Sequence, residues 1–166
     1  MHDEAEAALA AHAGERLALI AGSHARLTGQ ALARAGDGAR AGDGAPAGDV
    51  ARTLWRLPAV VLAHGTEDDP LFFWANRAAL DLFELDWRSL IRMPSRLSAE
   101  APNRAERAAL LDTVARRGFI RDYAGVRISA TGRRFRIAQA TVWNLVDADG
   151  VPHGQAASFS QWTRLD

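Results

Sequence analysis

The stretch FIRDYAGVRISATGRRFRIAQATVWNLVDADGVPHGQAASFSQW, Phe119–Trp162, decides the fold of this chain. It is rich in β-branched and aromatic residues, and two turn sequences divide it, Ala130–Gly132 and Asp147–Gly150. Three strands are therefore predicted here: Phe119–Ser129, Arg133–Val146 and Val151–Trp162. Because both connections are short, the strands form an antiparallel meander.

Two shorter apolar segments upstream, Pro58–His64 and Leu71–Asn76, are predicted to join this meander. Three strands alone make a small sheet, and two more give it a hydrophobic face that helices can cover. Helices are expected between Asn76 and Gly118, with Asn76 and Asp86 as N-caps of two short ones. The predicted fold class is α+β, a five-stranded antiparallel sheet with short helices on one face, plus an N-terminal helical segment.

The composition divides the chain into three parts: an N-terminal helical segment (1–35), a flexible Gly/Asp/Ala linker (36–49) and the main domain (50–166). The linker region repeats AGDGA, at Ala35–Ala39 and Ala41–Ala45, and offers no apolar side chain larger than alanine. We expect residues 36–48 to be disordered, and residues 50–166 to stay folded after cleavage there.

The N-terminal segment reads as two helices with a narrow apolar face, which needs something to pack against. Gly14 and the Gly22-Ser23 pair interrupt the pattern, and Ser23 can cap the second helix. Asp49 can cap a further helix, Val50–Leu57, at the start of the main domain.

The composition also restricts the function. The chain has 166 residues, no cysteine and a formal net charge of +0. Without cysteine there is no disulfide, thiolate nucleophile, cysteine-ligated zinc or cysteinyl-flavin adduct. The neutral charge predicts no nucleic-acid or membrane partner, and no apolar run approaches the ~20 residues that span a bilayer. The acidic start does not resemble an export signal, so we expect a cytoplasmic protein.

Six separated blocks, in order, resemble the MEKHLA domain. This PAS-like module occurs at the C-terminus of plant class III homeodomain–leucine zipper proteins and as a short stand-alone bacterial protein. The blocks are HGTEDDPLFFWANRAALDLFELDW (64–87), PSRLSAE (94–100), ERAALL (106–111), YAGVRISATGRRFRI (123–137), VWNLVDADG (142–150) and GQAASF (154–159). The resemblance covers about residues 50–162 and leaves the N-terminal helices and the linker outside. It implies a sensory or interaction role and no reaction.

Several polar groups could carry chemistry, and each has a simpler interpretation. His64 with Glu67, Asp68 and Asp69 has metal-ligand residue types, but HGTEDDP is also typical of a solvated turn. His64 or His153 could bind haem, although a lone histidine is more often a structural hydrogen-bonding group.

Two serines, Ser95 and Ser98, lack the sequence context that activates a nucleophile. We therefore predict no catalytic residue and no metal. The cofactor stays unknown, with non-covalent flavin left open.

Four arginines of the meander, Arg127, Arg133, Arg134 and Arg136, form one dense basic patch. Nucleic acid is one interpretation, a solvated face paired with carboxylates is another, and an arginine fork for a carboxylate ligand is the third. The sequence leaves open whether they bind anything.

The alternation along Arg133–Val146 suggests where a ligand could lie. One face carries Phe135, Ile137, Gln139, Thr141, Trp143 and Leu145, and we expect it to be the concave, helix-covered one. Small-molecule sites are mostly apolar with a few polar groups. The tentative ligand-binding residues are Phe72, Trp74, Phe83, Trp87, Phe135, Ile137, Gln139, Trp143 and Phe159.

The outward face of the same strand presents Ala138, Ala140, Val142 and Val146, which is apolar for a surface in water. We expect the N-terminal helices to cover this face, within one chain or across a dimer, and to mediate self-association or contact with a protein partner. The leading functional hypothesis is a non-enzymatic sensory or interaction module, with or without a small apolar ligand. The alternatives are an enzyme that uses the same cavity and a dimerisation module with a filled core.

Overall fold

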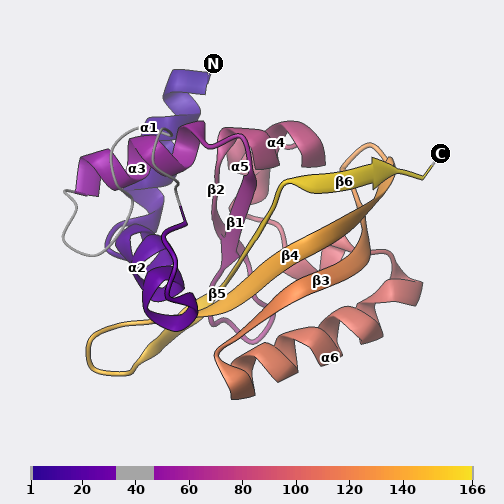
Figure 1. Cartoon of the computed structure of the whole chain (residues 1–166). Coiled ribbons are helices and arrows are strands. Elements are labelled where there is room, and N and C mark those ends of the chain that lie inside the picture. Colours follow the sequence, from indigo (N-terminus) through magenta and orange to yellow (C-terminus); the bar gives the residue numbers. More distant parts are fainter. Residues whose placement is uncertain (1, 33–46, 166) are drawn as a thin grey trace.

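The computed structural model describes residues 2–32 and 47–165, which fold around one antiparallel sheet (Figure 1). The strand order is β2-β1-β5-β4-β3, and β6 pairs with β4. The strands are β1 (Val60–His64), β2 (Phe72–Ala75), β3 (Phe119–Ile128), β4 (Arg134–Val146), β5 (Pro152–Phe159) and β6 (Gln161–Arg164). The helices are α1 (His2–Ala13), α2 (Arg16–Thr28), α3 (Ala47–Arg56), α4 (Arg77–Phe83), α5 (Trp87–Leu90), η1 (Ser95–Ser98) and α6 (Ala101–Arg117).

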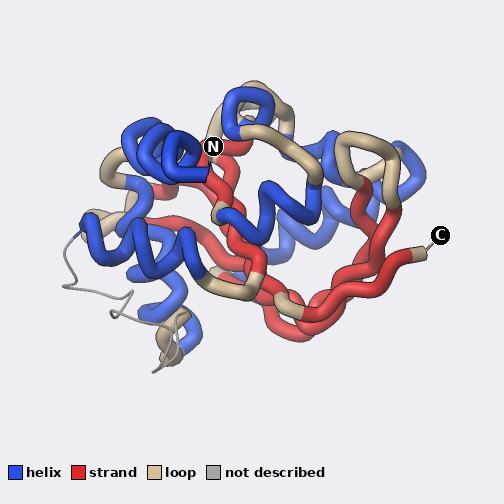
Figure 2. Tube along the Cα trace, turned by 90° about the horizontal axis from the view of Figure 1, so that it is seen from above, coloured by secondary structure: helices blue, strands red, loops and turns tan. Residues whose placement is uncertain are grey.

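Helices cover both faces of this sheet, as two adjacent residues of β4 demonstrate. Val142 packs with Leu110 and Val114 of α6. Trp143 donates its indole N–H to the backbone oxygen of Ile20 in α2, at 3.0 Å. Successive residues of a strand point to opposite faces, so α6 lies on one face, the α6 face, and α2 on the other, the α2 face. Figure 2 shows the strands as one continuous curved band past the helices.

A β-bulge in β4 changes the predicted arrangement of side chains. Gln139 adopts a left-handed backbone conformation, with φ 52°, and the β3–β4 register steps from Tyr123↔Ala140 to Gly125↔Ile137. One extra residue of β4 thus lies between these pairs, and it reverses the alternation. Phe135 and Ile137 lie on the predicted concave face, but Trp143 and Leu145 fall on the α2 face. The prediction that residues 135, 137, 139, 141, 143 and 145 all share one face was therefore wrong, because the bulge puts the residues after it on the opposite face.

The N-terminal helices share a core with the sheet. Leu9 of α1 and Ile20 of α2 are fully buried in the same cluster as Trp143 and Leu145. The N-terminal helices therefore cover the sheet within one chain, as one of the two predicted arrangements has it. They cover the α2 face, which carries Trp143, and not the predicted face, which carries Val142. No helix in residues 2–32 or 47–165 is long and apolar enough to cross a membrane.

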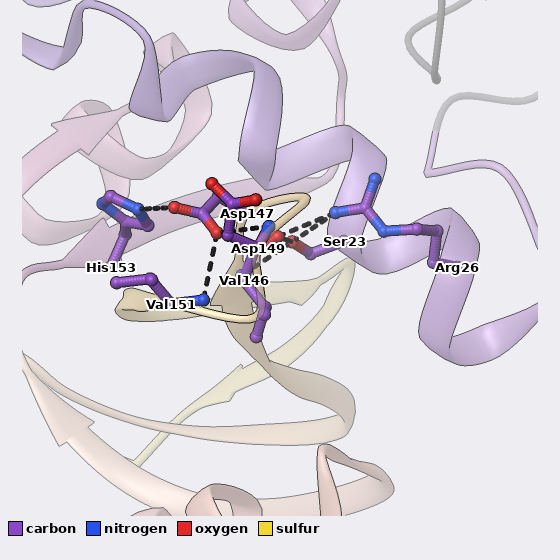
Figure 3. A network of polar contacts seen from close by, with 7 residues as sticks. All are labelled: Ser23, Arg26, Val146, Asp147, Asp149, Val151 and His153. Carbon is purple, nitrogen blue, oxygen red and sulfur yellow. Dashed lines mark hydrogen bonds and ion pairs between the residues drawn. The ribbon is translucent and has the colours of Figure 1, made fainter.

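A polar clasp joins α2 to the β4–β5 hairpin (Figure 3). The Ser23 hydroxyl accepts a hydrogen bond from the Val146 N–H at 3.0 Å and donates to the Val146 oxygen at 3.3 Å. Arg26 donates to the same oxygen at 2.8 Å. Ser23 lies inside α2, so the prediction that it caps a new helix was wrong. The interruption lies at Gly14, where φ is 58°.

Asp147 holds the turn of that hairpin. Its carboxylate accepts hydrogen bonds from the N–H groups of Asp149 and Val151, at 2.9 and 3.0 Å, and lies 2.8 Å from the His153 ring. The hydrogen bond with the His153 ring, and then the bonds from the two backbone N–H groups, keep the pKa of the Asp147 carboxyl below its ordinary value. The turn that α2 contacts is therefore locally ordered.

Some boundaries differ from those predicted. The helix expected from Val50 begins at Ala47, so the last three residues assigned to the linker are helical. The single strand expected over Val151–Trp162 divides at Ser160 into β5 and β6, which adds a sixth strand. Disorder was predicted for residues 36–48. Of these, residues 36–46 lie outside the described part of the chain.

Candidate functional site

A cavity of about 50 Å³ lies on the α6 face, between the sheet and the helices α4, η1 and α6. Strand β5 supplies part of its floor through Gln155, Ala157 and Phe159, and β1 supplies Leu62 and His64 at register positions beside them. Its further walls are Phe72, Phe83, Ser98, Arg107, Leu110, Leu111, Tyr123, Arg127, Ile137, Val142 and Ala156. The walls are mainly apolar, with a few polar groups, as is common in small-molecule sites.

Two buried arginines border this cavity. Arg107 of α6 is 9% exposed and Arg127 of β3 is 7% exposed. Arg127 donates to the Val126 oxygen at 2.8 Å and to the Tyr123 hydroxyl at 3.2 Å. Burial, and then the neighbouring Arg127 charge, lower the pKa of Arg107 to about 10. Arg107 therefore remains a cation at neutral pH.

Tyr123 connects Arg127 to the protein surface. Its hydroxyl donates to the carboxylate of the exposed Glu106, with the nearer oxygen at 3.0 Å. Burial raises the pKa of the Tyr123 phenol, so the group stays protonated and can make this donation. Glu106 reaches Arg127 only through this hydroxyl.

A neutral polar network forms another wall. The His64 Nε2 lies 3.2 Å from Gln155 Oε1, and Gln155 Nε2 donates to the Leu111 oxygen at 2.9 Å and to Asn144 Oδ1 at 3.1 Å. Burial, and then the Arg107 charge, lower the pKa of His64 to about 4. His64 is therefore a neutral hydrogen-bonding group at pH 7.

Acid should destabilise the fold through His64. Between its folded pKa of about 4 and its ordinary value of 6.5, the unfolded chain binds one more proton than the folded chain. The stabilisation is complete above pH 6.5 and is lost as the pH falls toward 4. Going from about pH 7 to about pH 4.5 should cost roughly 2–3 kcal/mol through this residue.

Urea denaturation at both pH values checks this, with His64→Gln as the comparison. His12 and His24, whose pKa values are also lowered by burial, remain in both proteins, so their contribution cancels. The variant should lose less stability than the wild type on acidification. Equal losses would contradict the assignment.

The cavity adjoins an open groove of about 630 Å³ between α6 and the β1–β2 hairpin. Arg107, His64, Leu111 and Gln155 border both spaces. These four side chains therefore lie where the two spaces meet.

The structure brings together only part of the predicted ligand-binding set. Phe72, Phe83, Ile137 and Phe159 line the cavity, and Phe135 packs edge-on against Phe83 at 5.2 Å between ring centroids. Trp74 pairs with Ala63, next to the cavity residues Leu62 and His64, and so belongs with Trp143 on the α2 face.

Two other predicted residues lie away from the cavity. Trp87 borders a surface hollow beside Glu4 and Arg88. Gln139 is exposed and accepts a hydrogen bond from Gln161. As ligand contacts, the predicted residues remain a hypothesis.

The structure also places the polar residues that the sequence offered as metal or haem ligands. Asp69 pairs with Arg96 at 3.1 Å, and Glu67 accepts the Leu71 N–H. His153 pairs with Asp147. In the described residues, no three His, Asp or Glu side chains gather as a metal site. A cavity of about 50 Å³ is far below the ~300 Å³ at which drug-sized ligand pockets begin, so a flavin would need a larger cavity than the one in this structure.

The arginine patch does not exist as one surface. Arg127 turns into the cavity, Arg133 lies 3.9 Å from Glu84 and Arg134 lies 3.6 Å from Glu100. Arg136 is exposed. Sequence reasoning missed Arg107 and Tyr123 altogether.

Comparison with known proteins gives one family and one fold. The MEKHLA domain profile matches residues 15–164. The match therefore begins well before residue 50, where the resemblance seen in the sequence begins, and it includes α2. The homeobox-leucine zipper protein HOX29 of Oryza sativa subsp. indica is 26% identical over 117 residues. This match covers 70% of the chain but only 14% of the rice protein, so the chain spans a small part of that relative's length.

Solved structures share the PAS fold. A PAS domain from Colwellia psychrerythraea aligns with a TM-score of 0.53 at 12% identity, over 65% of this chain and 89% of that one. An RNA-binding light-oxygen-voltage receptor aligns with a TM-score of 0.57 at 16% identity, over 72% of this chain and 32% of that one. At these identities the likeness concerns the fold alone.

Proposed function

The chain belongs to the MEKHLA domain family, and from this premise we propose that it is a non-enzymatic PAS-type sensory module. Its input is a small molecule in the α6-face cavity. Its output is the position or stability of the N-terminal helices on the α2 face, which offer their outward sides to a protein partner or a second copy.

The observation that carries this proposal is the sharing of strands between the cavity and the α2 face. Val142 lines the cavity, while the next residue, Trp143, bonds to α2. Packed interiors transmit small displacements because they deform little. A molecule that moves β4 or β5 from the cavity side therefore acts on the packing of α2.

Two observations support a role without catalysis. His64, with its pKa of about 4, is a weak base at neutral pH, and its Nε2 is engaged by Gln155. Ser98 donates its hydroxyl to the Ser95 backbone oxygen at 2.8 Å, with no histidine at that bond. An enzyme using the same cavity would need a base that neither residue supplies.

A second candidate, a dimerisation module with a filled core, is favoured by one observation. The cavity volume of about 50 Å³ holds only a few water-sized bodies, since one water needs about 10–15 Å³ by this measure. The ligand of the sensory module must therefore be small, or must enlarge the cavity toward the groove.

A fragment titration followed by amide NMR tests the sensory proposal. Fragments of varied charge should shift the resonances of Ile137 and Phe159 in the wild type. Ala157→Val fills part of the cavity with a residue suited to a strand, and should abolish these shifts. Ser158→Val, on the opposite side of β5, is the matched control and should bind like wild type. Absence of any fragment-induced shift at the cavity would favour the filled-core module.

A further inference from the structure

We propose that the cavity binds a short-chain organic carboxylate, whose carboxylate group lies between Arg107 and Arg127. This inference rests on the proposed function, because it assigns the chemical class of the molecule that the cavity receives. It starts from the charges of the cavity walls.

The two buried guanidinium groups have no carboxylate partner in the described part of the chain. The ion pairs there instead use exposed arginines: Arg88 with Glu4, Arg96 with Asp69 and Arg116 with Asp112, at 2.8, 3.1 and 3.4 Å. Arg107 borders the open groove and keeps access to water there, but it has no partner in the protein, and two nearby charges of the same sign repel each other. An anion between them would offset this repulsion and replace water as the partner of Arg107.

The available hydrogen-bond donors point to the same position. Arg127 uses one donor on each terminal nitrogen, for the Val126 oxygen and the Tyr123 hydroxyl. A guanidinium carries five N–H donors, so Arg127 has others to offer. Arg107 makes no hydrogen bond or ion pair with the rest of residues 2–32 and 47–165, so its full planar fork remains for a ligand. This fork matches the two oxygens of a carboxylate.

The opposite walls decide between carboxylate classes. Leu62, Ile137, Val142 and Phe159 offer an apolar surface and no cation. A dicarboxylate would place its second charge there, and inorganic phosphate would leave oxygens there without donors. A single carboxylate with a short apolar chain satisfies both ends, and the volume of about 50 Å³ limits that chain to a few carbon atoms.

Access agrees with this orientation. Arg107 borders both the cavity and the open groove, so it meets an incoming anion before the apolar walls do. His64 and Gln155 border both spaces too, and His64 is neutral at pH 7 and adds no competing charge.

Calorimetry and thermal unfolding with sodium butyrate, butyramide and sodium phosphate test the inference on the whole chain, with sodium chloride matching the ionic strength. Butyrate should bind and raise the melting temperature. Its uncharged amide, of nearly the same shape, should bind at least about tenfold more weakly, since it loses the charged hydrogen bonds. Butyramide or phosphate binding as tightly as butyrate would overturn the inference, as would no binding of butyrate.

Arg107→Met provides the residue-level test, with Arg116→Met, an exposed position on the same helix, as the matched control. The first variant should bind butyrate at least about tenfold more weakly and the control should bind like wild type. Without ligand, Arg107→Met should melt at or above the wild-type temperature, because it removes a largely buried cation that has no protein partner and is repelled by Arg127. A melting temperature clearly below that of Arg116→Met would mean that Arg107 has a stabilising partner in the protein, and would contradict the inference.

The two proposals fail in different ways. If neutral fragments reach the cavity in the NMR titration but butyrate does not bind, the sensory proposal stands and the carboxylate assignment is wrong. If no fragment and no butyrate binds, both are wrong. Binding of butyrate that Ala157→Val leaves unchanged would place the anion elsewhere and overturn the assignment.

Discussion

Replacing Asn76 by alanine is expected to lower the free energy of unfolding by about 3–5 kcal/mol, because the change leaves several buried polar groups without partners. Asn76 is fully buried. Its side-chain oxygen accepts from the N–H groups of Val61 and Ala79, at 3.0 and 3.1 Å. Its nitrogen donates to the oxygens of Leu54 and Ala59, at 3.0 and 2.8 Å. One side chain therefore joins α3, β1 and the start of α4.

Asp86→Ala is the matched control. Asp86 also caps a short helix, accepting the Ser89 N–H at 2.8 Å, but it is exposed and water can replace it. Its loss should cost about 1 kcal/mol, the usual effect of an N-cap. Urea denaturation of both variants measures the difference. Equal losses would mean that the Asn76 network contributes only as a cap.

Trp143→Ala should cost about 3–5 kcal/mol, the range for removal of a large buried aromatic side chain. The indole is fully buried and donates a hydrogen bond to the Ile20 backbone oxygen. It also packs edge-on against the His24 ring, with 4.8 Å between the ring centroids. The loss should also loosen α2, whose docking depends on this side chain. Trp143 is not a cavity wall, so the variant should still bind butyrate. Its affinity should change only through the coupling between the cavity and α2, which acts in both directions.

Two further variants separate packing from hydrogen bonding. Trp143→Phe keeps most of the apolar volume but removes the donor, and should cost less than the alanine variant, with about 1 kcal/mol due to the hydrogen bond. Trp162→Ala, at a position 41% exposed, should cost under about 1 kcal/mol. A small loss for Trp143→Ala together with lost ligand binding would instead restore Trp143 to the cavity.

The element order and the caps of α4 and α5 were predictable because their signals are local, whereas the caps predicted at Ser23 and Asp49 were wrong, since both residues lie inside helices. Asn76 and Asp86 cap α4 and α5, as predicted from their positions before short apolar runs. The PAS-like sheet follows from strand composition and turn residues. These features depend on a few neighbouring residues and need no knowledge of packing.

The site was only partly predictable because two signals are not local. Nothing in the sequence marks Gln139 as a bulge, since its left-handed conformation is unusual for a residue other than glycine, asparagine or aspartate. One extra residue was enough to move Trp143 to the other face. By contrast, a signal for Arg107 existed: it lies three and seven residues before Leu110 and Val114, on the apolar side of α6.

Hydrogen exchange of α2 in the cavity-filled variant Ala157→Val tests most directly whether the sheet connects the cavity to the N-terminal helices. The backbone amides of Arg16–Thr28 should exchange at a rate different from that of the wild type, by about threefold or more, corresponding to roughly 0.7 kcal/mol in local stability. The control Leu165→Ala, at a position 44% exposed, should leave these rates unchanged. Altered exchange in β4 and β5 with unchanged exchange in α2 would contradict the account.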